Sequence, residues 1–302
     1  MVQLGKTALA VSEIGLGADH FGTAISERDA EAILDAYLAA GGNFIDTANI
    51  YGKWVAGAGN ASERFLGKWL KGRKGVVVAT KGGHYTFDQP ERMRLSRAEI
   101  EADLDESLLT LGLDTVDLYY LHRDDPTRKI GEILDTMEHF VKKGKIRYYA
   151  ASNYTASRLL QADVYAKAHG ITGFSAVSNR FSALKENVVA SDPTLVVARE
   201  DELSFHQKSG IPLVPYQSTA RGYMQKRLEG RLTDGLLRQY HNRDNEALYY
   251  ELLRFSEENA CSLQTATLVK TAKQSFQVIP LTSVRAPAQM KDIEDAITLL
   301  SQ

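Results

Sequence analysis

Short apolar runs alternate with longer amphipathic segments along the whole chain of 302 residues. Runs with strand character occupy 13–18, 43–48, 76–81, 117–122, 146–153, 174–179, 212–217 and 277–282. Helical periodicity covers 27–40, 61–71, 97–111, 130–143, 156–169, 193–209, 247–259 and 286–299. Because no glycine-serine linker or change of composition interrupts this series, we predict one α/β domain, a (β/α)8 TIM barrel over residues 1–302.

Residues that favour helix ends flank several of these helical segments. A serine or threonine precedes three of them, at Ser26, Ser96 and Thr155. A glycine ends four of them, at Gly41, Gly112, Gly144 and Gly170. These residues support the helix boundaries that the periodicity predicts.

An open, doubly wound sheet is the main alternative for such a series. The stretch "GLGADHFG" at 15–22 contains glycines, but it lacks the GxGxxG pattern and no helix of the right kind follows it. The closed barrel is therefore favoured. In a barrel, catalytic groups gather where the strands end, and Asp46, Lys81, His122 and Asn153 all occupy such positions.

Composition excludes several classes of partner and site. The formal net charge of -2, with both signs mixed along the chain, predicts no nucleic-acid partner. Cys261 is the only cysteine, which excludes an internal disulfide, and the histidines show no metal-ligand spacing, so no metal is expected. The longest apolar runs are of strand length and no signal-peptide core is visible. We expect a cytoplasmic protein without a membrane partner, with a monomer as the default.

Four side chains near strand ends have complementary chemistry. Asp46 and Tyr51 lie in "FIDTANIYG", Lys81 in "VVVATKGG" and His122 in "DLYYLHRDDP". A tyrosine is a poor acid at neutral pH unless a cation stabilises the phenolate that it becomes, and Lys81 can supply that cation. Asp46 would keep Lys81 charged, while His122 could orient a carbonyl oxygen or share in the proton transfer. The set predicts proton delivery to a carbonyl oxygen while hydride arrives at its carbon.

Longer blocks of sequence resemble the aldo-keto reductases over nearly the whole chain. They include "EIGLGADHFG", "FIDTANIYG", "SERFLGKWLKGR", "VVVATKGG", "LDESLLTLGLDTVDLYYLHRDDP", "GKIRYYAASN", "VPYQSTARG" and "VIPLTSVRAPAQM". The resemblance implies a (β/α)8 barrel, a nicotinamide cofactor held without a Rossmann fold, and a catalytic tetrad at Asp46, Tyr51, Lys81 and His122. The implied reaction is reduction of an aldehyde or ketone to an alcohol.

The resemblance also implies the cofactor contacts. The residues expected to bind the cofactor are Ser152, Asn153, Ser178, Tyr216, Gln217, Ser218, Thr219, Arg221, Thr282, Ser283, Arg285 and Gln289. Arg285 precedes a helix and suits a 2′-phosphate, which favours NADPH, with NADH as the alternative. Two departures from the family pattern, Ser178 for a common glutamine and Ile293 for a frequent asparagine, leave the carboxamide and adenine contacts open.

The substrate is expected to be a small polar carbonyl compound, such as a sugar or another keto compound. Its predicted contacts are His20, Phe21, Trp54, His84 and Arg123. The segments 181–202 and 226–245 are further places where specificity could reside, the second as a solvated helix or a mobile lid. Two other functions stay open: a nicotinamide-binding regulatory or redox-sensing barrel, and a lyase that forms a Schiff base on Lys81.

Overall fold

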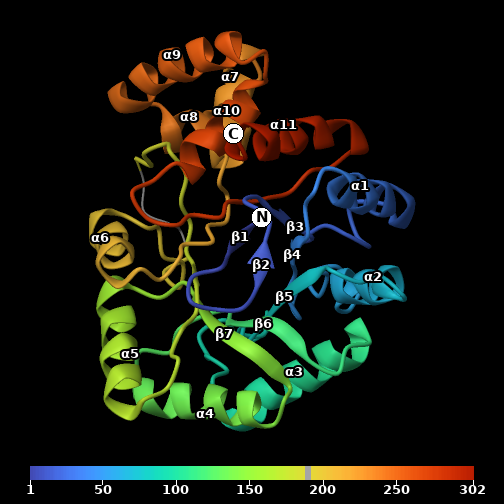
Figure 1. Ribbon diagram of the computed structural model, residues 1–302, viewed down its shortest axis with the longest axis vertical. Coiled ribbons are helices and arrows are strands. Elements are labelled where there is room, and N and C mark those ends of the chain that lie inside the picture. The colour runs from blue at the N-terminus through green and yellow to red at the C-terminus, as the bar shows by residue number, and fades with distance from the viewer. Residues whose placement is uncertain (188–191) are drawn as a thin grey trace.

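The computed structural model describes residues 1–187 and 192–302. Seven parallel strands form a curled sheet in the order β8-β7-β6-β5-β4-β3-β9, with helices packed around its outside (Figure 1). The strands are β3 (Gly15–Gly17), β4 (Phe44–Asp46), β5 (Val77–Gly82), β6 (Val116–Leu121), β7 (Ile146–Ser152), β8 (Val177–Ser178) and β9 (Leu281–Thr282).

The segment 212–216 fills the gap between β8 and β9 and closes the barrel. Leu213 forms parallel bridges to Val177 on one side and to Val278 on the other. Pro212 and Pro215 flank the bridge and have no backbone N–H, so the ladder is interrupted and no continuous strand forms here. The predicted (β/α)8 barrel is confirmed, with its seventh strand reduced to single bridges.

Helices cover the outside of the barrel. They are α1 (Glu27–Ala39), α2 (Ala61–Leu70), α3 (Arg97–Leu111), α4 (Ile130–Lys142), α5 (Ala156–His169), α6 (Glu200–Ser209), α7 (Tyr223–Leu228), α8 (Asp234–Tyr240), α9 (Arg243–Glu258), α10 (Leu263–Ala272) and α11 (Met290–Leu300). Ser26, Ser96 and Thr155 each accept a backbone N–H at a helix start, as predicted. Gly112 and Gly170 end their helices with φ of 68° and 63°, which only glycine adopts at little cost.

The predicted helix at 193–209 is wrong over its first part. Ala198 donates its backbone N–H to the carbonyl of Arg180 at 2.8 Å, and Val197 bridges to Arg180, so this stretch is extended. Helix α6 begins only at Glu200, where the side chain of Glu202 accepts the backbone N–H of Arg199. Residues 188–191 of the predicted specificity segment 181–202 lie outside the described residues.

A short N-terminal hairpin covers one end of the barrel and was not predicted. Strands β1 (Val2–Gln3) and β2 (Ala10–Val11) pair antiparallel, and Figure 1 shows them across the ring of strands. Leu4, Leu9 and Val11 are buried with the inward-facing side chains of the barrel strands. The interior of the barrel is thus a packed core that is closed at the end opposite the strand C-termini.

The predicted insert at 226–245 is packed against the body of the protein. Helix α8 buries Leu236 and Tyr240 in a cluster with α7, α9 and α10. Figure 1 shows these helices together, beside α11. Among the described residues no helix is both long and apolar enough to cross a membrane.

Candidate active site

A cavity of about 950 Å³ opens at the C-terminal ends of the barrel strands. Asp46 ends β4, Lys81 lies next to the end of β5, and His122 directly follows β6. The backbone N–H of His122 donates to the carbonyl of Gly82 at 2.8 Å, which extends the ladder and holds the two strand ends together. All four predicted catalytic residues line this cavity.

Tyr51 reaches the cavity from the turn after β4. Gly52 follows it with φ of 108°, and a Cβ there would lie 2.7 Å from the carbonyl oxygen of Gly59 and from the nitrogen of Ala61. Only glycine therefore allows this turn to pack against the start of α2. The tyrosine ring lies edge-on to the ring of His122, with centroids 5.9 Å apart.

The ammonium group of Lys81 has three acceptors. Its Nζ donates to a carboxylate oxygen of Asp46, to the carbonyl of Thr47 at 2.8 Å and to the hydroxyl of Tyr51 at 3.4 Å. Three acceptors match the three donors of a protonated amine. The contacts therefore favour the charged form of Lys81 directly beside the tyrosine hydroxyl.

Burial and the ion pair act on the pKa values of Lys81 and Asp46 in opposite directions. Burial lowers the pKa of Lys81, and the carboxylate of Asp46 counteracts this. Burial likewise raises the pKa of Asp46, and Lys81 counteracts that shift. The charge of each group is therefore stabilised mainly by the other.

Tyr51 holds its proton firmly in this setting. Burial raises the pKa of Tyr51 well above its ordinary value, the carboxylates of Asp46 and Asp19 add to the shift, and the guanidinium of Arg123 opposes it. The hydroxyl is therefore a protonated donor at physiological pH. It can release its proton only to an acceptor that becomes strongly basic during a reaction.

His122 is neutral in the site. Burial lowers its pKa well below the ordinary value, and His84, Arg123 and Lys81 add to the shift. Its Nδ1 is buried without a hydrogen-bond partner in the described part of the chain. No contact therefore fixes the hydrogen on Nδ1, and the Nε2 tautomer can present an N–H to a ligand.

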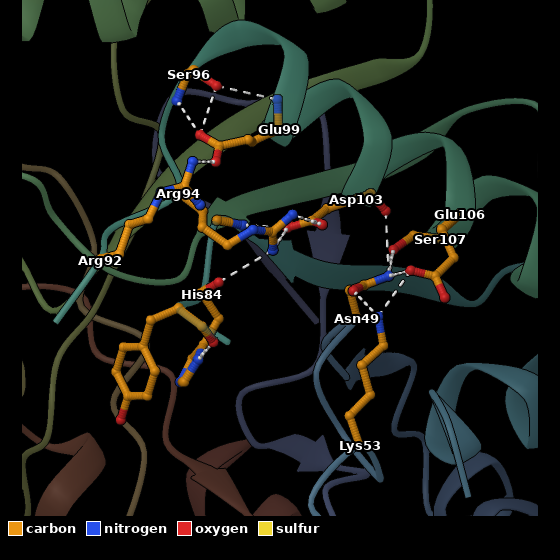
Figure 2. Close-up of polar contacts among 12 residues, drawn as sticks. Asn49, Lys53, His84, Arg92, Arg94, Ser96, Glu99, Asp103, Glu106 and Ser107 are labelled. Carbon is orange, nitrogen blue, oxygen red and sulfur yellow. Dashed lines mark hydrogen bonds and ion pairs between the residues drawn. The ribbon is translucent and has the colours of Figure 1, made fainter. Parts of the chain in front are cut away.

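A second polar network joins the residues around His84 to helix α3 (Figure 2). Arg94 forms a two-pronged ion pair with Asp103 of α3, at 2.8 and 3.0 Å, and Asp103 also accepts the backbone N–H of Gly83 at 2.9 Å. The network fixes the loop after β5, so that the His84 ring packs 4.8 Å from that of His122. Burial and Arg123 lower the pKa of His84 to about 4, so this neighbour is neutral too.

Glu63 is a buried acid next to the site that the sequence reading did not single out. It accepts hydrogen bonds from Thr80 at 2.6 Å and Asn60 at 3.1 Å, and burial raises its pKa to about 7. The unfolded chain releases this proton near the ordinary value of 4.5, so the free energy of unfolding falls as the pH rises from 4.5 to 7. Glu63→Gln lacks this titrating group. We therefore expect its free energy of unfolding, relative to that of the wild type, to rise by about 2–3 kcal/mol from pH 5 to pH 8.

Urea unfolding of both proteins at pH 5, 6.5 and 8 measures this difference. Glu91→Gln, at an exposed position, is the matched control and should follow the wild type at each pH. If the curves of wild type and Glu63→Gln stay parallel across the range, the raised pKa of Glu63 is contradicted.

Every residue predicted to contact the cofactor lines the same cavity. Most of these side chains already have partners within the protein. Asn153 donates to the carbonyl of His122 and to Ser152, and its oxygen accepts the Tyr216 hydroxyl at 2.7 Å and the Val196 N–H. At the far end, Ser283 donates to Asp19, and Gln289 accepts the backbone N–H groups of Arg285 and Ala286.

Ser178 differs from these residues. Its hydroxyl is buried and has no partner among the described residues, and the residue lines the same cavity. The hydroxyl of its neighbour Ser152 is bonded to the Ser178 carbonyl at 2.9 Å. Ser178 therefore offers a fully buried hydroxyl that has no partner in the described part of the chain.

Cations gather at the far end of the cavity, and two of them were not predicted. Lys226 and Arg231 line it together with Arg221 and Arg285. Burial lowers the pKa of Lys226, and the three arginines lower it further. Like charges held together beside a cavity favour an anionic ligand there. Lys226 and Arg231 both lie in the charged insert at 226–245, and this position was the signal that could have identified them.

The predicted substrate contacts divide into two groups. His20 and Arg123 line the cavity. Trp54 lies at the surface, 43% exposed, edge-on to Tyr51 with ring centroids 5.9 Å apart. His84 borders a small separate pocket that Lys81 also lines. Phe21 does not line the cavity: it is buried and packs against Phe65, because the turn after β3 directs it into the core between α1 and α2.

Comparison with known proteins gives relatives for most of the chain. The chain is 29% identical over 230 residues to the norsolorinic acid reductase stcV of Emericella nidulans, and the match covers 71% of this chain and 55% of that protein. It is 36% identical over 190 residues to the uncharacterized oxidoreductase YrpG of Bacillus subtilis, covering 60% and 58%. A norsolorinic acid reductase of Aspergillus flavus is 27% identical over 294 residues, covering 91% and 71%.

The chain spans less than two thirds of the length of the first two of these relatives. A family model described as "Aldo/keto reductase family" matches residues 13–302, which is nearly the whole chain. The match extends over the barrel and over every side chain that lines the cavity. The chain belongs to the aldo/keto reductase family.

Proposed function

We propose that this protein is an NADPH-dependent reductase that converts an aldehyde or ketone to an alcohol, with Tyr51 as the proton donor. The contact of Lys81 with both Asp46 and the Tyr51 hydroxyl, at the wall of a large cavity, is the observation that carries the proposal. The family of the chain supports it. NADH is the alternative cofactor.

The residues around the cavity fit a dinucleotide with negative charge at one end. At the catalytic end, the vacant hydroxyl of Ser178 would bind the nicotinamide carboxamide, with the Tyr216 ring beside it. At the other end, Arg221, Lys226, Arg231 and Arg285 would bind phosphate groups. When bound, NADPH supplies the hydride that the carbonyl carbon receives.

Side chains of the protein supply the proton that the carbonyl oxygen receives. As the carbonyl oxygen gains negative charge, it becomes basic enough to take the proton from Tyr51. Lys81 then stabilises the phenolate through the 3.4 Å contact, and Asp46 keeps Lys81 charged. Neutral His122 would donate a hydrogen bond that orients the carbonyl oxygen.

The same contacts argue against the lyase alternative. A Schiff base requires a neutral amine with a free lone pair. Lys81 instead donates to three acceptors, as a protonated amine does. No comparable feature favours the regulatory alternative over turnover.

Loss of NADPH absorbance with a panel of aldehydes, keto-sugars and dicarbonyls tests the proposed function. We expect turnover with at least one class and formation of the matching alcohol. Binding of NADPH without any turnover across the panel would favour the regulatory alternative instead.

Arg285→Ala is expected to weaken NADPH binding about 10–100-fold and NADH binding much less. The guanidinium lies 3.0 Å from the ring of His20, at the cationic end of the cavity. Only NADPH carries the 2′-phosphate, so only NADPH would lose a charged hydrogen bond in this variant. Fluorescence titration with each cofactor measures the two dissociation constants.

Lys291→Ala is the matched control for this prediction. Lys291 is an exposed cation on α11 that pairs with Asp295 and does not line the cavity. Both cofactors should bind this variant as they bind the wild type. Equal weakening of NADPH and NADH by Arg285→Ala would refute the role of Arg285 at the 2′-phosphate.

A further inference from the structure

Arg123 is a buried cation in the wall of the catalytic cavity. It directly follows His122 at the end of β6 and only 7% of its surface is exposed. It lines the cavity together with Tyr51, Lys81 and His122. Its charge opposes the raised pKa of Tyr51 and helps to lower the pKa of His122, so it lies within electrostatic reach of the reacting groups.

The guanidinium of Arg123 is held in place without being fully paired. Its Nε donates to the hydroxyl of Thr194 at 2.9 Å and its Nη1 to the carbonyl of His122 at 2.9 Å. Both of these partners are neutral. Nη2 makes no hydrogen bond to a described carboxylate, since its ion contact with Asp192 is 3.7 Å long, and the neutral hydroxyl of Tyr85 also interacts with the guanidinium. A guanidinium has five N–H donors, so donors remain for a further ligand.

Asp192 is oriented by other residues. One carboxylate oxygen accepts the backbone N–H and the hydroxyl of Thr194, at 2.8 and 2.6 Å, and the other accepts the hydroxyl of Tyr85 at 3.2 Å. The carboxylate thus partly offsets the charge of Arg123 without occupying its donors. A buried guanidinium whose charge is only partly offset favours binding of a further anion. Its planar fork of N–H donors matches the two oxygens of a carboxylate.

The other groups near Arg123 suit a small organic acid. The Tyr85 ring lies 5.8 Å from the guanidinium, and His84, whose ring packs at a tilt of 49° against that of Tyr85, is neutral. With one arginine already offset in part by Asp192, a single negative charge is better matched than a phosphate dianion. Arg123 lines the same cavity as Tyr51 and acts on its pKa, so a carboxylate bound by Arg123 would lie in the cavity in which the carbonyl group would be reduced.

From this geometry, and on the basis of the proposed reductase function, we infer that Arg123 binds a carboxylate of the substrate and that the preferred substrates are small oxo acids. These are aldehydes or ketones that carry a carboxylate. Arg123 would then fix the orientation in which the carbonyl oxygen meets Tyr51 and His122.

Two aldehydes with the same skeleton test this inference. 4-Carboxybenzaldehyde carries the negative charge, and its methyl ester does not. We expect wild-type kcat/KM to favour the acid about tenfold or more, and Arg123→Gln to lower this ratio about tenfold, chiefly through KM for the acid. Arg97→Gln, at an exposed position on α3, is the control and should keep the wild-type ratio.

Asp192→Asn gives an independent variant if Arg123→Gln fails to fold. Removing the carboxylate that partly offsets Arg123 should increase the preference for the acid over the ester. Equal turnover of acid and ester by the wild type, or an unchanged ratio in both variants, would overturn the inference and leave the reductase function standing.

Terephthalate separates failure of this inference from failure of the reductase function, because it has carboxylates and no aldehyde. Calorimetric titration should show binding to the wild type and about tenfold weaker binding to Arg123→Gln. Weaker terephthalate binding by Arg123→Gln, in a protein that reduces no aldehyde, would support the anion site and refute the proposed reductase function. Equal affinities would refute the role of Arg123 whatever the enzyme reduces.

Discussion

Tyr51→Phe is expected to lower kcat about 10²–10⁴-fold, which is the contribution typical of a positioned proton donor. The substitution removes the hydroxyl that Lys81 contacts and keeps the ring that lies edge-on to His122. Because the proposed cofactor contacts lie elsewhere in the cavity, NADPH affinity should change little. Steady-state rates with 4-nitrobenzaldehyde and fluorescence titration with NADPH give the two quantities.

Tyr85→Phe is a matched control for Tyr51→Phe. Tyr85 also ends in a hydroxyl near the catalytic side chains, but it donates to Asp192 and does not line the cavity. Its loss should lower kcat for this uncharged aldehyde far less. A wild-type rate in Tyr51→Phe would show that the proton comes from another group.

Lys81→Met is expected to destabilise the fold by about 3–5 kcal/mol and to abolish turnover. The substitution leaves the carboxylate of Asp46 buried without its cation, and one of its oxygens already has no partner among the described residues. Urea unfolding at pH 7 measures the loss. The destabilisation should shrink at low pH, where the unpaired carboxylate becomes protonated.

The double variant Asp46→Leu/Lys81→Met separates stability from catalysis. Replacing both buried charges with apolar side chains removes the uncompensated carboxylate, so much of the lost stability should return. Turnover should not return, since no cation remains beside Tyr51. Additive destabilisation by the two substitutions would show that the ion pair is not the stabilising unit.

The barrel and the arrangement of its catalytic end were predictable from the sequence for a physical reason. Parallel strands place their C-termini at one end, so residues far apart in the chain, such as Asp46, Lys81 and His122, meet once the strands are identified. The resemblance to a family added the residues that are proposed to bind a cofactor. Local patterns sufficed here because each strand is followed by a helix.

Other features depend on contacts that no local pattern encodes. Val197 forms a parallel bridge to Arg180. Because of this bridge, the chain is extended where the sequence predicted the start of a helix. Helix α10 was missed because its threonines have low helix propensity and tertiary packing decides its conformation. Likewise, only the folded chain shows that the amide of Asn153 is fully bonded and that the hydroxyl of Ser178 is not.

Transfer of deuterium tests the central claim most directly. Wild-type protein, 4-nitrobenzaldehyde and NADPH deuterated at the transferable position of the nicotinamide should give an alcohol with one deuterium on the carbon that bears the hydroxyl, as mass spectrometry would show. Tyr51→Phe should give almost none of this product at the same cofactor occupancy. Absence of the labelled alcohol with wild type, or equal formation by the variant, would contradict the proposed function and mechanism.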